Sequence, residues 1–107
     1  MIENEEMIGM MEAVAKEVLP IGSRLWLYGS RARGEARKDS DWDLLVLLDK
    51  PELELKDYAL AYPFHALGAD LGEYISPIIY AKNEWEAQSF LPFYKNVERD
   101  KIELKWD

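Results

Sequence analysis

A glycine–serine pair followed by two aspartates is the pattern in this sequence that is best suited to chemistry. Ten residues separate Gly29-Ser30 from the triplet Asp41-Trp42-Asp43. Gly29 follows an apolar run, where a residue without a side chain lets the backbone turn and lets a ligand approach closely. Ser30 stands where the next helix is expected to begin, and free N–H groups at such a point bind phosphate oxygens. The pair therefore predicts a site for phosphate.

The two aspartates predict a metal site. Side chains alternate along a strand, so Asp41 and Asp43 are expected on one face and Trp42 on the other. Two adjacent carboxylates beside an apolar run need a cation, and oxygen ligands of this kind suit Mg²⁺ that is shared with substrate phosphates. A phosphate site that faces such a metal favours phosphoryl or nucleotidyl transfer.

Basic residues cluster between the two halves of this pattern. Arg31, Arg33, Arg37 and Lys38 lie close together in a chain that has 21 acidic and 13 basic side chains and a net charge of −8. We expect this cluster to contact a polyphosphate through charge-assisted hydrogen bonds. The acidic balance of the whole chain disfavours broad, non-specific binding to nucleic acids, which depends on neutralising phosphates.

Length and composition limit the class of protein. A chain of 107 residues with 49% hydrophobic and 32% charged residues is expected to form one domain over residues 1–107. The lack of cysteine and the single histidine, His65, exclude disulfide scaffolds, cysteine-based zinc sites and paired-histidine metal motifs. The longest apolar run, Leu44 to Leu48, is far shorter than the ~20 residues of a membrane helix. The acidic N-terminus lacks the positive flank of a signal peptide, and we expect the protein in the cytoplasm.

Hydrophobic periodicity predicts the elements that position these residues. Pro63 is expected to kink or divide the longest helix after the motif, and Pro77 favours an edge position or a bulge for the last strand. Asn83 and Glu86 resemble a capping box that starts a helix near Glu84. This order of elements indicates a small α/β layer structure. The other expected elements are a helix at 7–18, a strand at 25–28, a short helix at 30–35, a central strand at 41–48, a helix at 55–71, a strand at 74–80 and a short helix that includes Phe93 and Val97.

The motif resembles the signature of the DNA polymerase beta-like nucleotidyltransferase superfamily. The chain looks closest to its minimal nucleotidyltransferases, which are little more than the catalytic core. The resemblance implies a small mixed β-sheet with helices packed against it, the nucleotidyltransferase fold. The similar segments are Gly29-Ser30-Arg31-Ala32-Arg33-Gly34 and Ser40-Asp41-Trp42-Asp43-Leu44-Leu45-Val46.

The same resemblance implies a reaction. Gly29 and Ser30 are expected to hold the triphosphate of an NTP, most readily ATP, while Asp41 and Asp43 bind Mg²⁺. An acceptor hydroxyl attacks the α-phosphorus, and pyrophosphate leaves. The nucleotide-binding residues are expected to include three of the basic side chains, Arg31, Arg33 and Lys38.

The family often has a third carboxylate on a neighbouring strand, which helps to bind metal and to activate the acceptor. Glu73, expected at the start of the third strand, is the best candidate for this catalytic and metal-binding position, and Asp70 is the second. If neither reaches the metal, the chain is instead a catalytically incomplete module that binds a nucleotide or a partner.

The acceptor is expected on another molecule, because a chain of this size has no room for an acceptor domain. Minimal nucleotidyltransferases often act beside a small helical HEPN-type protein in toxin–antitoxin pairs. The resemblance implies such a partner for this chain.

Overall fold

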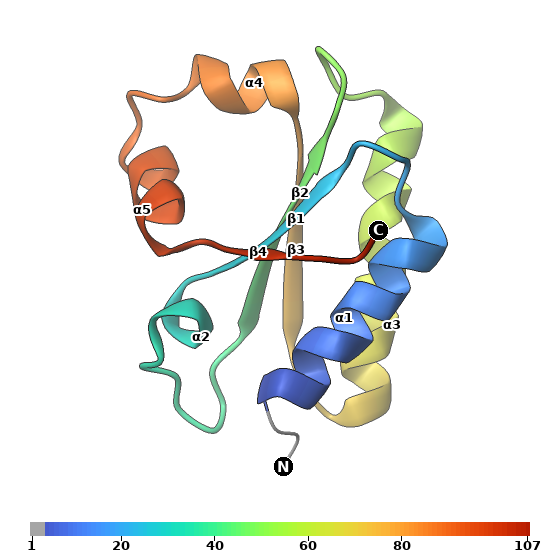
Figure 1. The fold of residues 1–107 in the computed structure, drawn as a ribbon, viewed down its shortest axis with the longest axis vertical. Coiled ribbons are helices and arrows are strands. Elements are labelled where there is room, and N and C mark those ends of the chain that lie inside the picture. Colours follow the sequence, from blue (N-terminus) through green and yellow to red (C-terminus); the bar gives the residue numbers. More distant parts are fainter. Residues whose placement is uncertain (1–3) are drawn as a thin grey trace.

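The chain folds into a small sheet with helices on both sides (Figure 1), seen here in a computed structural model that describes residues 4–107. This architecture confirms the predicted fold class. In chain order the elements are α1 (Asn4–Val18), β1 (Arg24–Tyr28), α2 (Ser30–Arg33), β2 (Trp42–Leu48), the 3₁₀ helix η1 (Leu55–Ala61), α3 (Tyr62–Leu71), β3 (Ile75–Ala81), α4 (Lys82–Ala87), α5 (Pro92–Asp100) and β4 (Ile102–Leu104).

The four strands form one mixed sheet in the order β3-β2-β1-β4. Strand β2 runs parallel to β3 and antiparallel to β1, and β4 pairs antiparallel with β1. The predicted central place of the second strand is confirmed, because β2 lies between β1 and β3 and residues 44–48 are all buried. Strand β3 lies at an edge, where the missing N–H of Pro77 is tolerated.

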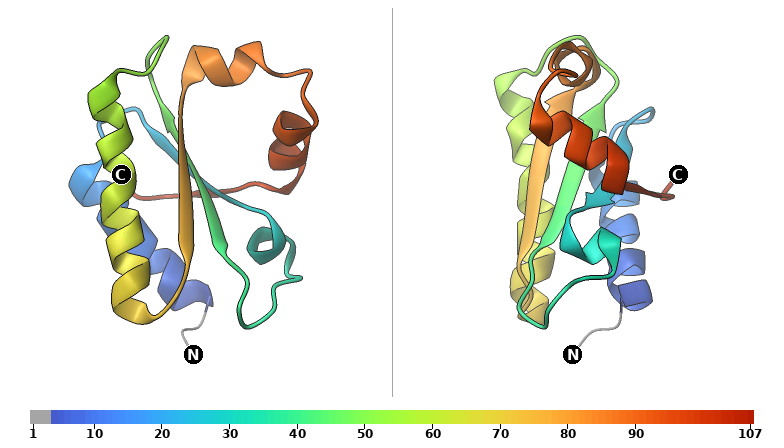
Figure 2. Two further views of the ribbon diagram at one scale, coloured as in Figure 1. Left: turned by 180° about the vertical axis from the view of Figure 1, so that it is seen from behind. Right: turned by 90° about the vertical axis from the view of Figure 1, so that its left-hand side faces the viewer.

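Helices cover both faces of the sheet (Figures 1 and 2). Each face has its own apolar cluster. On one face, Met7 and Met11 of α1 and Phe64 of α3 pack against the sheet. On the other face, Trp85 of α4 is 1% exposed and lies edge-on to Trp26, with ring centres 6.1 Å apart. Because side chains alternate along β2, its residues contribute to both clusters.

The end of the chain contains a strand that the hydrophobic pattern did not predict. Strand β4 has only three residues, too few for an alternation signal, yet it pairs with β1, and Trp106 just beyond it joins the cluster under α1 and α3. The predicted capping box at Asn83 is wrong, because α4 begins directly after β3 and Ala81 takes the N-cap position. The expected division at Pro63 is confirmed, since η1 ends and α3 begins just before it.

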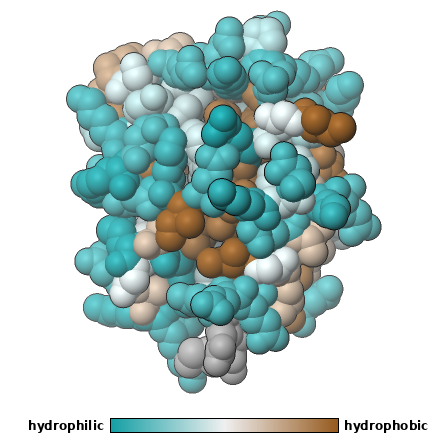
Figure 3. Space-filling model, viewed as in Figure 1, coloured by the Kyte–Doolittle hydropathy of each residue, from teal (hydrophilic) through white to brown (hydrophobic). Residues whose placement is uncertain are grey.

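The face of the molecule in Figure 3 is largely hydrophilic, in keeping with the 32% of charged residues in the sequence. Smaller hydrophobic areas lie between the hydrophilic side chains on this face (Figure 3). No helix within residues 4–107 has the length and apolar character needed to cross a membrane.

Gly68 sets how closely α3 approaches the turn into β3. A Cβ at this position would lie 2.9 Å from the carbonyl oxygen of Glu73 and 3.2 Å from the backbone nitrogen of Ile75. Neither backbone atom can move without shifting the turn, so we expect Gly68→Ala to lower the free energy of unfolding by about 1–3 kcal/mol. Urea unfolding measures this change.

Gly9→Ala in α1 is the matched control. A Cβ at Gly9 meets no atom within 4 Å, so this variant should gain about 0.5–1 kcal/mol, because alanine favours a helix more than glycine does. An equal loss of stability at Gly9 and at Gly68 would contradict the steric explanation.

Candidate active site

The pairing of β1 with β2 brings the glycine–serine pair next to the aspartates. In the antiparallel register Tyr28 lies opposite Asp43. Gly29 and Ser30, which follow Tyr28, therefore lie at the same end of the sheet as Asp43. Trp42 is fully buried in the cluster under α1 and α3. Asp43 therefore points to the opposite face, as the alternation of a strand predicts.

Gly29 is required here both by its backbone angles and by its neighbour. Its φ is 77° and its ψ is −159°, a region that is essentially open to glycine alone. A Cβ on this residue would collide with Oδ2 of Asp43. The carboxylate therefore occupies the space that any larger side chain would need.

Ser30 begins α2, which ends at Arg33, two residues earlier than predicted. The N–H groups of Ala32 and Arg33 donate the first helical hydrogen bonds, to the residue before the helix. The N–H groups of Ser30 and Arg31 precede these bonds and have no acceptor within the helix. Together with the Ser30 hydroxyl they are donors of the kind that bind phosphate, and they directly follow Gly29, which lies against Asp43.

The two aspartates interact electrostatically, although only Asp43 belongs to β2. Asp41 is exposed and precedes the strand by one residue, rather than opening it as predicted. Burial raises the pKa of Asp43, the charge of Asp41 raises it further, and the positive charge of Arg33 opposes both effects. A divalent cation would relieve this repulsion, and two carboxylates that share an ion with substrate phosphates are a donor set that fits Mg²⁺.

We expect Asp43→Asn to stabilise the ligand-free protein at neutral pH. A carboxyl whose pKa is raised by folding favours the folded state below its ordinary pKa, about 4, and this contribution is lost as the pH rises through the folded-state pKa. Asparagine carries no charge, so the gain in melting temperature should be small near about pH 4 and larger at neutral pH. Thermal unfolding across this range measures it, with Asp49→Asn at the exposed far end of the strand as control. A variant at Asp43 that melts below wild type at neutral pH would contradict this interpretation.

Arg31 is held against the loop that leads to Asp41. Its Nε and one terminal nitrogen donate hydrogen bonds to the carbonyl oxygen of Ser40, at 3.3 and 2.9 Å. Its guanidinium also lies over the ring of Trp42, 4.3 Å from the ring centre, which adds a cation–π interaction. Arg31 therefore fixes the residues on both sides of Asp41.

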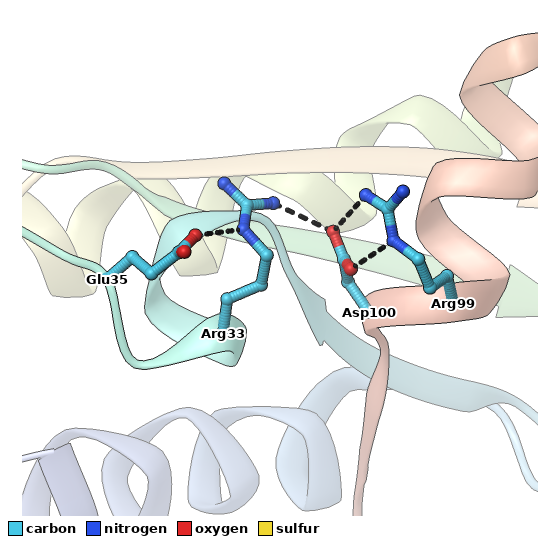
Figure 4. A network of polar contacts seen from close by, with 4 residues as sticks. All are labelled: Arg33, Glu35, Arg99 and Asp100. Atoms are coloured by element: carbon cyan, nitrogen blue, oxygen red, sulfur yellow. Dashed lines mark hydrogen bonds and ion pairs between the residues drawn. The ribbon is translucent and has the colours of Figure 1, made fainter.

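Arg33 is the basic residue whose charge acts on Asp43. Its Nε donates a hydrogen bond to Glu35 at 2.6 Å, and one terminal nitrogen donates to Asp100 at 2.8 Å (Figure 4). These hydrogen bonds, the one to Glu35 first, raise the pKa of Arg33. The guanidinium is therefore a fixed positive charge at this end of the sheet.

Lys38 and Glu73, two further candidates, line a groove of about 1300 Å³. The groove lies between residues 38–40 and the turn from α3 to β3, and its wall also includes His65 and Tyr74. Neither aspartate of the motif is part of this wall. The structure therefore places these two candidates together, in a groove whose wall does not include Asp41 or Asp43.

Glu73 lies before β3, which begins at Ile75, so the predicted place of this residue in the strand is wrong. Its N–H donates a hydrogen bond to the carbonyl oxygen of Gly68 at 2.9 Å and closes the end of α3. Among residues 4–107 there is no group of three or more histidine, aspartate or glutamate side chains that could hold a metal. Neither Glu73 nor Asp70 therefore joins the pair of aspartates in this structure.

Two neighbours of Asp43 were missed by the sequence analysis. Ser76 lies opposite Asp43 in the parallel register of β2 with β3, so a hydroxyl takes the adjacent place on the neighbouring strand. Burial, followed by the charge of Asp43, raises the pKa of Tyr28 to about 12, and this hydroxyl therefore keeps its proton at neutral pH. Only the strand register reveals both neighbours.

A family model matches most of this chain. The model is described as “Nucleotidyltransferase domain”, and the match covers residues 10–104. The chain belongs to this family. It is a nucleotidyltransferase, as the resemblance of the motif implied.

Solved structures share the fold of this nucleotidyltransferase. A crystal structure of a toxin–antitoxin with AMP-PNP has a TM-score of 0.63 at 20% identity, covering 98% of this chain and 75% of that one. A mutant of the toxin–antitoxin MntA-HpeT has a TM-score of 0.63 at 16% identity, covering 94% and 73%. Another mutant of that pair has a TM-score of 0.58 at 17% identity, covering 100% and 75%. At these identities the similarity establishes the fold alone, and no curated protein sequence matches the chain.

Proposed function

We propose that this nucleotidyltransferase transfers a nucleoside monophosphate to a hydroxyl group of a partner protein, with AMP from ATP as the first candidate. The proposal depends on one observation, the position of Asp43. Its carboxylate lies against Gly29, at the point where Ser30 begins α2. Hydrogen-bond donors for phosphate that lie next to metal-binding carboxylates favour transfer at the α-phosphorus of a nucleotide.

Each residue of the motif has a separate part in this proposal. Ser30 and the first N–H groups of α2 bind the phosphates that leave as pyrophosphate. Asp41 and Asp43 hold Mg²⁺, which when bound neutralises the charge on the phosphates. The acceptor hydroxyl gives up its proton to solvent water as its oxygen forms the new bond to the α-phosphorus and the bond from that phosphorus to pyrophosphate breaks. The reaction therefore needs positioned charge more than an unusual base.

The metal is proposed to have two protein carboxylates. Ser76, and no acidic residue, lies opposite Asp43 on β3. Mg²⁺ keeps several waters and is often bound by one or two carboxylates together with substrate phosphates. Phosphate oxygens and water therefore take the positions that a third carboxylate fills elsewhere in the family.

The partner is proposed to be the toxin of a toxin–antitoxin pair, with a HEPN-type helical protein as the first candidate. The similar structures are described as toxin–antitoxins, one of them with AMP-PNP. We therefore look for the acceptor hydroxyl on the other protein of such a pair.

Label transfer to a co-purified protein tests this proposal. The tagged chain is isolated together with its bound protein, and the complex is incubated with Mg²⁺ and ATP labelled at the α-phosphate. Label on the partner that is lost with EDTA and in Asp43→Asn supports the proposal, whereas label from the γ-phosphate would indicate a kinase instead. Nucleotide binding with no transfer to the partner favours a binding module.

A further inference from the structure

A carboxylate far along the chain holds Arg33 at the site. Asp100 is the last residue of α5, and its side chain is 6% exposed. It accepts a hydrogen bond at 2.8 Å from Arg33, which lies 67 positions earlier in the sequence. It also accepts hydrogen bonds at 2.9 and 3.4 Å from Arg99 (Figure 4). Asp100 is thus enclosed between two guanidinium groups and connects α5 to α2.

The carboxylates use only part of the hydrogen-bonding capacity of Arg33. A guanidinium has five N–H donors in a planar fork. In Arg33, Nε donates a hydrogen bond to Glu35 and one terminal nitrogen donates one to Asp100. Figure 4 marks no hydrogen bond from the other terminal nitrogen to either carboxylate. Donors are therefore left on a fixed positive group whose charge acts on Asp43.

We propose that Asp100 is a positioning residue for nucleotide binding, which holds Arg33 so that its free guanidinium nitrogen binds the triphosphate at Ser30. The inference rests on the proposed function, because it assigns a support to the same nucleotide site. Supports of this kind act by fixing the orientation of the group that touches the ligand.

Asp100 suits this task better than Glu35, the other partner of Arg33. Glu35 is 65% exposed and lies only two residues from Arg33, so its ion pair is open to water and moves with the same loop. Asp100 is enclosed and belongs to a different helix. Removal of Asp100 is therefore expected to disturb Arg33 more than removal of Glu35.

Calorimetric titration with AMP-PNP and Mg²⁺ tests the inference. Asp100→Asn removes the charge but keeps the size of the side chain, and we expect the Kd to rise about tenfold, as for one lost charge-assisted hydrogen bond. Glu35→Gln should have a smaller effect. Glu103→Gln is the matched control, because it breaks an ion pair of 3.0 Å with Arg24 that joins β1 to β4.

A double variant separates positioning from a general loss of structure. If Asp100 acts through Arg33, then Asp100→Asn should weaken binding no further once Arg33→Ala is present. Full additivity of the two changes would overturn the inference, and so would a Kd for Asp100→Asn within about twofold of wild type. If Asp100→Asn does not fold, Asp100→Glu keeps the charge at a shifted position, and an unchanged Kd there would also overturn it.

The outcomes for wild type keep the two proposals apart. If wild type and Asp100→Asn bind AMP-PNP equally well, the proposed function stands and Asp100 has no positioning role. Wild type that binds no nucleotide in the presence of Mg²⁺ overturns the proposed function and this inference with it.

Discussion

Replacing Asp43 by asparagine is expected to lower the rate of nucleotidyl transfer at least about a thousandfold while the protein stays folded. The amide has nearly the same shape as the carboxylate that lies against Gly29, but it lacks the charge that would share a metal with Asp41. Because the same change removes a repulsion in the ligand-free protein, activity and melting temperature should move in opposite directions. Transfer of α-labelled phosphate to the co-purified partner measures the loss.

Asp49→Asn is the control for this experiment. Asp49 is exposed and follows the last residue of β2, so it belongs to the end of the strand opposite the site. We expect its transfer rate to equal that of wild type. A rate for Asp43→Asn within about tenfold of wild type at saturating Mg²⁺ would show that Asp43 does not bind the essential metal.

Gly29→Ala is expected to damage both the fold and the site. An alanine with the backbone angles of Gly29 is strained by about 1–3 kcal/mol, and its Cβ collides with the carboxylate of Asp43. Relief of the collision moves Asp43 away from the donors of α2, so we expect transfer to fall at least about a hundredfold even where the protein is folded. Chemical unfolding and label transfer measure the two effects.

Gly34→Ala separates strain from collision. Gly34 also has a positive φ, 75°, but a Cβ on this residue meets no atom within 4 Å. We expect it to lose about 1–2 kcal/mol of stability through backbone strain alone and to keep its transfer activity. Equal losses of activity at Gly29 and Gly34 would show that contact with Asp43 is not the cause.

Local sequence was sufficient for the parts of the fold with a strong pattern. The apolar run at 44–48 predicted the central strand, because a strand that is buried on both faces is apolar at successive positions. The recurrence of Met7, Met11 and Val18 predicted the first helix, because one buried helical face repeats every three to four residues. Pro77 indicated an edge for a physical reason that holds in any sheet. Strand β4 was missed because three residues carry no measurable period.

The site could be predicted only where its residues are neighbours in sequence. The contact of Asp43 with Gly29 depends on the antiparallel pairing of β1 with β2. The place of Ser76 depends on the register of β2 with β3. Glu73 was expected at the start of the strand, but Gly72 before it ends α3 in a left-handed conformation, and the backbone of Glu73 bonds to Gly68 in this turn.

The link between α2 and the end of α5 has a consequence for synthesis. A ribosome that has just completed the glycine–serine and aspartate motif has not yet made Asp100, β4 or Trp106. Asp100 holds Arg33, β4 pairs with β1, and Trp106 packs in the core. Domains emerge from the ribosome N-terminal part first. The nascent chain therefore carries the whole glycine–serine and aspartate motif well before it has the elements that support it. Prematurely terminated products would keep the motif without these supports.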